Sequence, residues 1–236
     1  VVLLAIAPFL GRYIRIAMEN GQSRLTAWGR PLERGIYRLA GIDPQAEMGW
    51  KRYALAVLAF NILGIVAVYA LQRLQGLLPL NPAGMGAVSP DSSLNTAISF
   101  VANTNWQGYG GESTMSYLTQ MLALTVQNFV SAATGIAVVF ALIRGLARHC
   151  SATVGNFWAD MVRCTLYVLL PLSLVLAMAL VSQGVIQNFS PYQAVQTVET
   201  VHYDQPRVDA QGQPVLDVAG APVTDPATTR TQTLAM

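Results

Sequence analysis

The chain has 236 residues, of which 53% are hydrophobic and only 11% are charged. Soluble globular domains usually carry about 25% charged residues, so this composition argues against a soluble protein and for a membrane protein. The formal net charge of +2 is nearly balanced and gives no indication of a nucleic-acid partner.

The first apolar run, residues 1–10, has the composition of the end of a transmembrane helix. The sequence begins inside this run and without Met, so we expect a fragment of a longer protein. Residues 11–52 follow, and they contain eight of the fourteen Lys and Arg residues. By the positive-inside rule, we predict that this basic stretch is a cytoplasmic loop.

Residues 53–71 carry no charge and approach the roughly 20 residues that a spanning helix needs. Asn61 lies within this predicted span, and we expect its side chain to hydrogen-bond to another helix. Residues 74–114 come next and contain no Lys or Arg. Their lack of positive charge places them on the side opposite to the cytoplasm.

The most informative stretch is residues 89–112. Ser89 is a favourable N-cap, Pro90 suits the first helical position, and Asp91 suits the first turn. Apolar residues then recur at the i, i+3, i+4, i+7 spacing of a helix of about 12 residues. At 1.5 Å per residue this helix reaches only ~18 Å, which is too short to cross a hydrocarbon core of ~30 Å.

A polar, non-helical segment, residues 103–108, follows this short helix, and glycines then allow the chain to turn into a long apolar helix. This order predicts a re-entrant pore loop, whose bare backbone is allowed at membrane depth only where protein or water covers it. An extended segment can point successive carbonyl oxygens to one side, and rings of such oxygens replace the hydration shell of potassium. The carbonyl end of the short helix adds negative potential there. An external loop with an amphipathic helix on the membrane surface is the alternative explanation.

The next run, residues 115–143, is longer and also uncharged. Its polar and small residues recur at three- and four-residue steps on one face, which in lipid indicates contact with protein or a watery path. Close helix packing explains Ser131 and Gly135 better than an ion role, whereas both explanations stay open for Gln127 and Asn128. The residues of this face are Gln120, Gln127, Asn128, Ser131, Thr134 and Gly135.

Residues 144–163 contain three further arginines and are predicted to be cytoplasmic. Cys150 within this segment and Cys164 after it lack the spacing of a metal site, and a reducing compartment disfavours a disulfide. His149 has no partner at ligand spacing, so we expect it in solvent. The run from 164 to 181 is uncharged and predicts another span.

The tail, residues 185–236, is polar, and its five acidic residues outnumber its two arginines. The alternation of sides predicts an extracytoplasmic loop. We expect short strands near residues 197–203 and 215–223, and His202 in solvent.

Four blocks carry a family likeness. They are NTNWQGYGGES at 103–113, TVQNFVSAATGIAVVFALIRG at 125–145, PLNPAG at 79–84 and GID at 41–43. The chain resembles, over essentially its whole length, the potassium-transporting, potassium-binding subunit of the bacterial Kdp P-type ATPase complex. As departures, Gly108 and Gly110 stand where serines would be equally expected, which loosens the turn but leaves the carbonyls.

The resemblance implies an all-α integral membrane protein with channel-like repeats of span, pore helix and span around a re-entrant selectivity-filter loop, plus a polar extracytoplasmic loop. The implied segments are an N-terminal transmembrane end (1–10), a cytoplasmic basic loop (11–52), the first repeat with pore helix and filter (53–147), a cytoplasmic connection (148–163), the first span of the second repeat (164–184) and the extracytoplasmic loop (185–236).

The resemblance also implies that extracytoplasmic potassium binds in the filter and passes to an ATPase partner. Potassium would be held by the backbone carbonyls of Asn103, Thr104 and Asn105. The adjoining potassium-binding residues Trp106, Gln107 and Gly108 would lie just outside the filter. Because the family's filter has four such strands, one quarter of it cannot select an ion by itself.

The implied partners are a P-type ATPase catalytic subunit, two small accessory membrane subunits and the lipid bilayer of the bacterial plasma (inner) membrane. The resemblance further implies a multi-pass, non-hydrolytic subunit with potassium as its ligand and no organic cofactor. Consistent with this, the sequence contains no glycine-rich phosphate loop and no aspartyl-phosphate motif. A stand-alone potassium channel or transporter is the nearest alternative. Two further alternatives come from other functional classes, namely a membrane redox enzyme and a purely structural membrane anchor.

Overall fold

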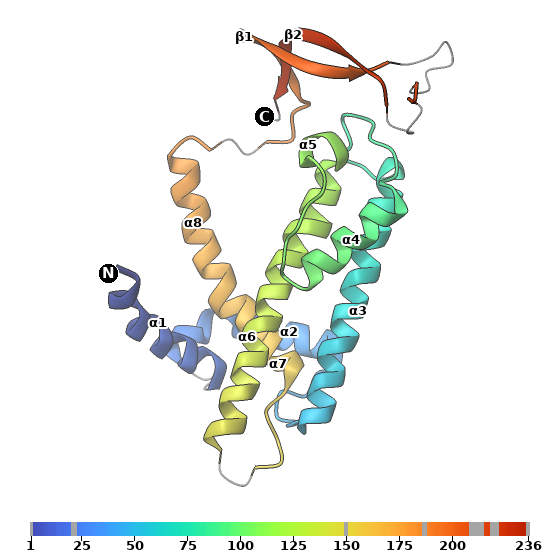
Figure 1. Ribbon diagram of the computed structural model, residues 1–236. Helices are drawn as coiled ribbons and strands as arrows, with labels where there is room; N and C mark the ends of the chain where they lie inside the picture. Colours follow the sequence, from blue (N-terminus) through green and yellow to red (C-terminus); the bar gives the residue numbers. More distant parts are fainter. Residues whose placement is uncertain are drawn as a thin grey trace. The chain divides into compact units, whose positions relative to one another are not determined.

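The computed structural model describes residues 2–19, 23–148, 151–185, 188–207, 215–217 and 222–234. The chain divides into two compact units, Val1–Ile186 and Gln187–Met236. The first unit is helical and the second is a two-stranded sheet (Figure 1). His149, which was expected in solvent, lies outside the described residues. Cys150, which was expected in the cytoplasmic segment 144–163, also lies outside them.

Three described helices are long and apolar enough to cross a membrane: Trp50–Leu77, Thr119–Ala147 and Phe157–Ser182. Helices therefore form at the three uncharged runs that were predicted to span, although the last begins seven residues earlier than expected. Each combines a regular helix with a tighter or wider turn. Their parts are α3 (Trp50–Leu74) with η2 (Gln75–Leu77), η3 (Thr119–Thr125) with α6 (Val126–Ala147), and α7 (Phe157–Arg163) with η4 (Cys164–Leu169) and α8 (Leu170–Ser182).

The amino-terminal region is more helical than the sequence indicated. Helix α1 (Val2–Glu19) continues beyond residue 10, and η1 (Arg24–Gly29) and α2 (Arg30–Ala40) occupy the stretch expected to be a loop. Helix α2 ends at Gly41, which has a φ of +64° and donates its N–H to the carbonyl of Tyr37. This left-handed glycine is a common helix stop. The three arginines of α2 recur at four-residue steps, which is itself a helical spacing that the sequence analysis did not use.

Helix α4 (Pro90–Val101) has 12 residues and begins as the sequence predicted. The Ser89 hydroxyl accepts a hydrogen bond from the Ser92 amide, which satisfies one of the free N–H groups at the helix start. Helix α4 lies against α3 and α6 (Figure 1). Ala97 and Phe100 are buried in one core cluster with Val68 of α3. Helix α4 is followed by the short α5 (Gly111–Thr114).

The second unit consists of β1 (Gln193–Pro206) paired antiparallel with β2 (Thr224–Leu234). The strand expected near 197–203 therefore lies within β1. Part of the strand expected near 215–223, residues 218–221, lies outside the described residues. The described part of that stretch forms an isolated Leu216–Pro222 bridge, and β2 begins at Thr224. The all-α class is corrected accordingly. Strand β2 is rich in threonine, whose branched side chain favours strands without adding apolar character.

Candidate functional site

The backbone of the segment that follows α4 is left-handed at two positions. Asn103 and Asn105 both have a φ of +57°, whereas Thr104 between them does not have a positive φ. Left-handed conformations are strained for most L-residues, and asparagine is among the few that adopt them readily. Two asparagines around a threonine therefore suit this local path. The segment is not the uniformly extended strand that the sequence suggested.

Three successive backbone amides of this segment converge on one residue, Ser99. The amides of Thr104 and Asn105 lie 2.9 and 3.3 Å from the Ser99 carbonyl oxygen. The Trp106 amide lies 2.5 Å from the Ser99 hydroxyl oxygen.

The carbonyl directions follow from these amide contacts. In a trans peptide the C=O group points opposite to the N–H group of the next residue, and the chain has no cis peptide bond. The carbonyls of Asn103, Thr104 and Asn105 therefore point away from Ser99. In the described part of the chain none of these three oxygens accepts a hydrogen bond.

Residues 103–108 are all exposed in this chain. The indole of Trp106 is 58% exposed, and the Gln107 amide donates to the Tyr109 hydroxyl at 3.4 Å. A Cβ atom at Gly108 would lie 2.9 Å from the Trp106 ring, so a side chain there requires the ring to move. The structure thus brings the six predicted residues together as one neutral, polar surface.

The sequence analysis missed Ser99, although a signal for it exists. Ser93, Thr96 and Ser99 recur at three-residue steps along α4, and all three are buried. The Ser93 carbonyl accepts a hydrogen bond from the buried Gln72 side chain of α3 at 3.1 Å. A row of buried hydroxyls in a short helix indicates that nearby backbone groups need partners.

One hydrogen bond joins the polar face of α6 to residues 103–108. The Ser131 hydroxyl donates to the side-chain oxygen of Asn103 at 3.2 Å. The side chain of Gln127, one turn earlier, comes close to Gly64 of α3, because a Cβ atom at Gly64 would lie 2.9 Å from its oxygen. The predicted face is therefore in contact with protein, and Ser131 does more than pack.

Several buried amide atoms in the spans have no hydrogen-bond partner among the described residues. They are the oxygens of Asn61, Gln72 and Asn128 and the nitrogen of Gln127. The expectation that Asn61 is fully satisfied is therefore wrong for this chain. Leaving such a group unpaired usually costs about 1–3 kcal/mol, so these atoms mark a surface where further polar groups would fit.

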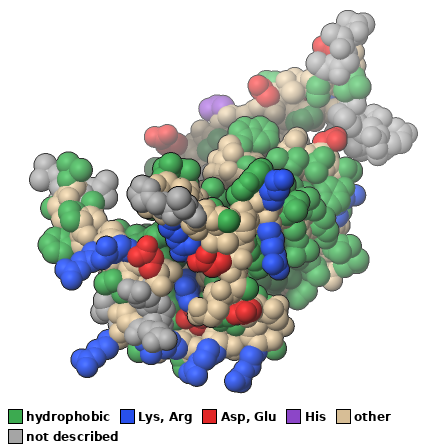
Figure 2. Space-filling view, turned by 90° about the horizontal axis from the view of Figure 1, so that it is seen from below, with side chains coloured by type: hydrophobic (Ala, Val, Ile, Leu, Met, Phe, Trp, Pro, Cys, Tyr) green, Lys and Arg blue, Asp and Glu red, His purple; other side chains and the backbone are tan. Residues whose placement is uncertain are grey.

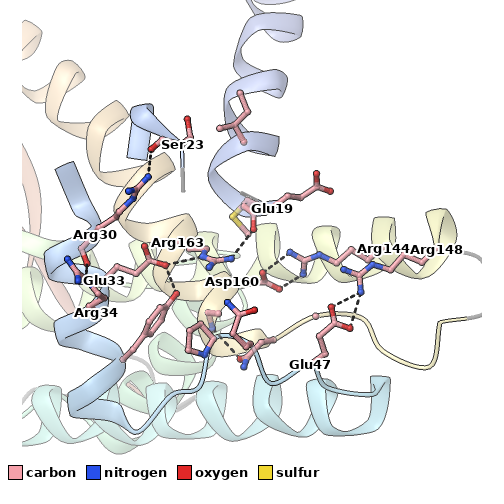
Figure 3. Close-up of a pocket in the computed structure, with 18 residues that line it drawn as sticks. Glu19, Ser23, Arg30, Glu33, Arg34, Glu47, Arg144, Arg148, Asp160 and Arg163 are labelled. Atoms are coloured by element: carbon pink, nitrogen blue, oxygen red, sulfur yellow. Dashed lines mark hydrogen bonds and ion pairs between the residues drawn. The ribbon is translucent and has the colours of Figure 1, made fainter. Parts of the chain in front are cut away.

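A second polar region lies at the basic end of the helical unit. A cavity of about 1370 Å³ is lined there by α1, α2, the ends of α6 and α7, and the chain before α3 (Figure 3). Seen from below, basic and acidic side chains gather on this face (Figure 2). The charged lining residues are Glu19, Arg30, Glu33, Arg34, Glu47, Arg144, Arg148, Asp160 and Arg163.

Ion pairs join the helices around this cavity. Arg144 of α6 binds both carboxylate oxygens of Asp160 of α7, at 2.6 and 2.9 Å, and Arg163 lies 3.0 Å from Glu33 of α2. Burial raises the pKa of Glu33, but hydrogen bonds from Tyr167, Tyr37 and Arg163 outweigh burial and hold that pKa below its ordinary value. Buried charges are tolerated only when they are paired in this way.

The described part of the chain contains no group of three or more His, Cys, Asp or Glu residues that could hold a metal ion. His202 is exposed on β1, as the sequence predicted.

The three candidate spans define a helical integral membrane protein. The model of one family, described as "Potassium-transporting ATPase A subunit", matches residues 1–219. The chain belongs to this family, and the resemblance noted in the sequence is confirmed.

Curated relatives that carry the name "Potassium-transporting ATPase potassium-binding subunit" match the whole chain. A protein of Bordetella parapertussis is 71% identical over 235 residues, one of Chromobacterium violaceum is 65% identical over 236, and one of Ralstonia pickettii is 64% identical over 236. Each alignment covers 100% of this chain but only 39–40% of the relative. The chain thus spans about two fifths of the length of these relatives.

Proposed function

We propose that this chain is part of the potassium-binding subunit of an ATP-driven potassium importer, and that residues 103–105 supply backbone carbonyls to its selectivity filter. The relatives' names support the function as a whole. The observation that carries the site is the convergence of three amides on Ser99, which turns the carbonyls of Asn103, Thr104 and Asn105 to the opposite side.

The chemistry follows from neutral oxygens held in fixed directions. Potassium leaves its hydration shell only if other oxygens replace the water, and carbonyl oxygens do so without the strong attraction of a carboxylate. Binding stays weak enough for the ion to leave. The carbonyl end of α4, which lies next to the segment on the Ser99 side, adds negative potential to the region. Trp106, Gln107 and Gly108 form the outer mouth.

The proposed architecture is that of a channel. Residues 53–147 form a first repeat, in which α4 is the pore helix and the segment after it is the re-entrant filter strand. Residues 164–184 open the second repeat, and 185–236 form an extracytoplasmic loop. Residues 1–10 end an N-terminal span, and 11–52 and 148–163 face the cytoplasm. The exposure of residues 103–108 agrees with further filter strands being supplied by the remainder of the full-length protein.

The division of labour in this proposal leaves ATP hydrolysis to a P-type ATPase partner. This chain contributes potassium binding and no hydrolytic chemistry, with potassium as its ligand and no organic cofactor. Two small accessory membrane subunits complete the complex in the bacterial plasma (inner) membrane, where the potassium-binding protein is multi-pass. The alternative, a stand-alone potassium channel or transporter, predicts potassium uptake without any ATPase partner.

ATP hydrolysis by the intact complex, measured against potassium concentration, tests the site. Gln107→Arg places a cation at the filter mouth and should raise the half-activating potassium concentration, more at low than at high salt. Asn105→Ala should raise it too, because alanine adopts a positive φ poorly. His202→Gln, on the separate β-sheet unit, is the control and should leave it unchanged. Overlapping curves for all four proteins would place ion selection elsewhere.

A further inference from the structure

The filter segment is attached to the rest of the protein on two sides. Its amides are held by Ser99 of α4. The side chain of Asn103 points to a different element, where its oxygen accepts the Ser131 hydroxyl at 3.2 Å. Among the described residues, this hydrogen bond is the one that joins residues 103–108 to a membrane-spanning helix.

Ser131 is well placed to act as a rigid anchor. It is only 4% exposed and lies in the second turn of α6. Its hydroxyl also lies 3.3 Å from the carbonyl oxygen of Asn128 in its own helix, which is the usual acceptor for a helical serine. The contact to Asn103 is the one that leaves the helix. Because the hydroxyl has one proton, the two acceptors compete for it, and the oxygen of Asn103 is the nearer of the two.

Asn103 is a residue whose backbone needs such support. Its φ of +57° lies in the left-handed region, which asparagine adopts more readily than most L-residues but still at a cost. Its own N–H donates to the Phe100 carbonyl at 3.2 Å, so one side of the residue is held by α4. Rotation at Asn103 would swing its carbonyl, the first of the three that point away from Ser99. The side-chain hydrogen bond to α6 opposes that rotation.

We propose that Ser131 is a positioning residue for potassium: through the Asn103 side chain, α6 fixes the direction of the first filter carbonyl. This inference rests on the proposed function of residues 103–105. It predicts that loss of the Ser131 hydroxyl loosens that carbonyl, so that potassium binds less tightly and smaller or larger cations are discriminated less well. The maximal rate, which does not depend on this contact, should stay the same.

The experiment compares Ser131→Ala with Thr134→Val in the intact complex. Thr134 lies one turn along α6, and its hydroxyl donates to the Val130 carbonyl of its own helix. Thr134→Val therefore removes a buried hydroxyl without touching the filter segment. Losing one net hydrogen bond should raise the half-activating potassium concentration about three- to tenfold in Ser131→Ala. Thr134→Val should leave it unchanged, and Ser131→Thr should restore most of the affinity.

A second arm tests whether Ser131 acts through the Asn103 side chain. Asn103→Gly removes that side chain but keeps a residue that adopts a positive φ freely. In this background Ser131→Ala should have no additional effect, because the partner is already absent. Equal effects of Ser131→Ala with and without the Asn103 side chain would overturn the inference.

Failure of this inference can be told apart from failure of the proposed function. If Gln107→Arg shifts the potassium curve while Ser131→Ala matches Thr134→Val, the filter placement stands and the role of Ser131 is refuted. If Gln107→Arg and Ser131→Ala both leave the curve unchanged, the filter placement itself fails, and the inference fails with it. Complex assembly, measured by size-exclusion chromatography, confirms that each variant is folded before the comparison is made.

Discussion

The proposed filter segment, residues 103–108, and the charged cavity are both polar, but the first carries no charge and the second contains buried ion pairs. Residues 103–108 carry no charge, and the three carbonyls after α4 accept no hydrogen bond in the described chain. Around the cavity, by contrast, carboxylates of α2 and α7 are buried and paired with arginines. Unused neutral oxygens suit an ion that must bind and leave. Buried, paired charges suit a permanent contact between helices.

The largest effect is expected at the joint between α6 and α7. Arg144→Leu leaves Asp160 buried without its partner, which should lower the free energy of unfolding by about 3–5 kcal/mol. Arg144→Leu/Asp160→Leu should recover most of this loss. Thermal unfolding of the full-length protein in detergent measures it.

Arg148→Gln is the matched control for this joint. The Arg148–Glu47 pair lies at the same end, but its side chains are 39% and 43% exposed, so its loss should cost about 0–1 kcal/mol. If Arg144→Leu were no more harmful than Arg148→Gln, the contrast between a rigid joint and a solvated surface would be unfounded.

A glycine beside the same joint should have the next largest effect. Gly155 has a φ of +111°, and a Cβ atom there would overlap a guanidinium nitrogen of Arg144. Gly155→Ala should therefore destabilise the protein by about 1–3 kcal/mol through strain and displacement of the guanidinium. Gly145→Ala is the control, because its Cβ would meet Val154 at an ordinary 3.9 Å. Equal melting temperatures for the two variants would show that the arginine can move freely.

A substitution next to residues 103–108 should change potassium binding more than it changes the stability of the protein. Ser99→Ala removes the acceptor of the Trp106 amide but keeps the Ser99 carbonyl that holds Thr104 and Asn105. With about 1 kcal/mol lost, the half-activating potassium concentration should rise about fivefold while the melting temperature changes little. Ser93→Ala, two turns earlier on α4, is the control. A large drop in melting temperature with unchanged potassium dependence would make Ser99 a purely structural residue.

The sequence predicted what depends on local patterns. The uncharged runs showed the three spans, and Ser89, Pro90 and Asp91 showed where α4 begins, because capping uses residues close in the chain. It also located residues 103–108 as one polar segment.

What the sequence could not show depends on three-dimensional proximity. The carbonyl directions come from the backbone handedness at Asn103 and Asn105 and from hydrogen bonds to Ser99, none of which a propensity describes. The pairing of Arg144 with Asp160 joins two separate helices. The sequence analysis places both residues in the predicted cytoplasmic stretch 144–163 through the positive-inside rule, which carries no information on which charges pair.

The smallest expected effect is a loss of stability in acid, which should depend on the charged cavity and not on residues 103–108. Glu33 has a lowered pKa because its hydrogen bonds from Tyr167, Tyr37 and Arg163 outweigh the opposing effect of burial. A carboxylate with a lowered folded-state pKa contributes stability that is fully present above its unfolded pKa of about 4.3 and is lost as pH falls through the folded value. Melting temperature should therefore decline in this acid range, and Glu33→Gln should flatten that part of the profile. Gln107→Glu is the control. It adds a carboxylate at an exposed position of the proposed filter mouth, so the decline in melting temperature should be the same as in the unmodified protein. A decline that persists unchanged in Glu33→Gln would assign the acid sensitivity to other carboxylates of the charged cavity, such as Glu47, whose pKa is lowered by hydrogen bonds from Thr153 and Arg148.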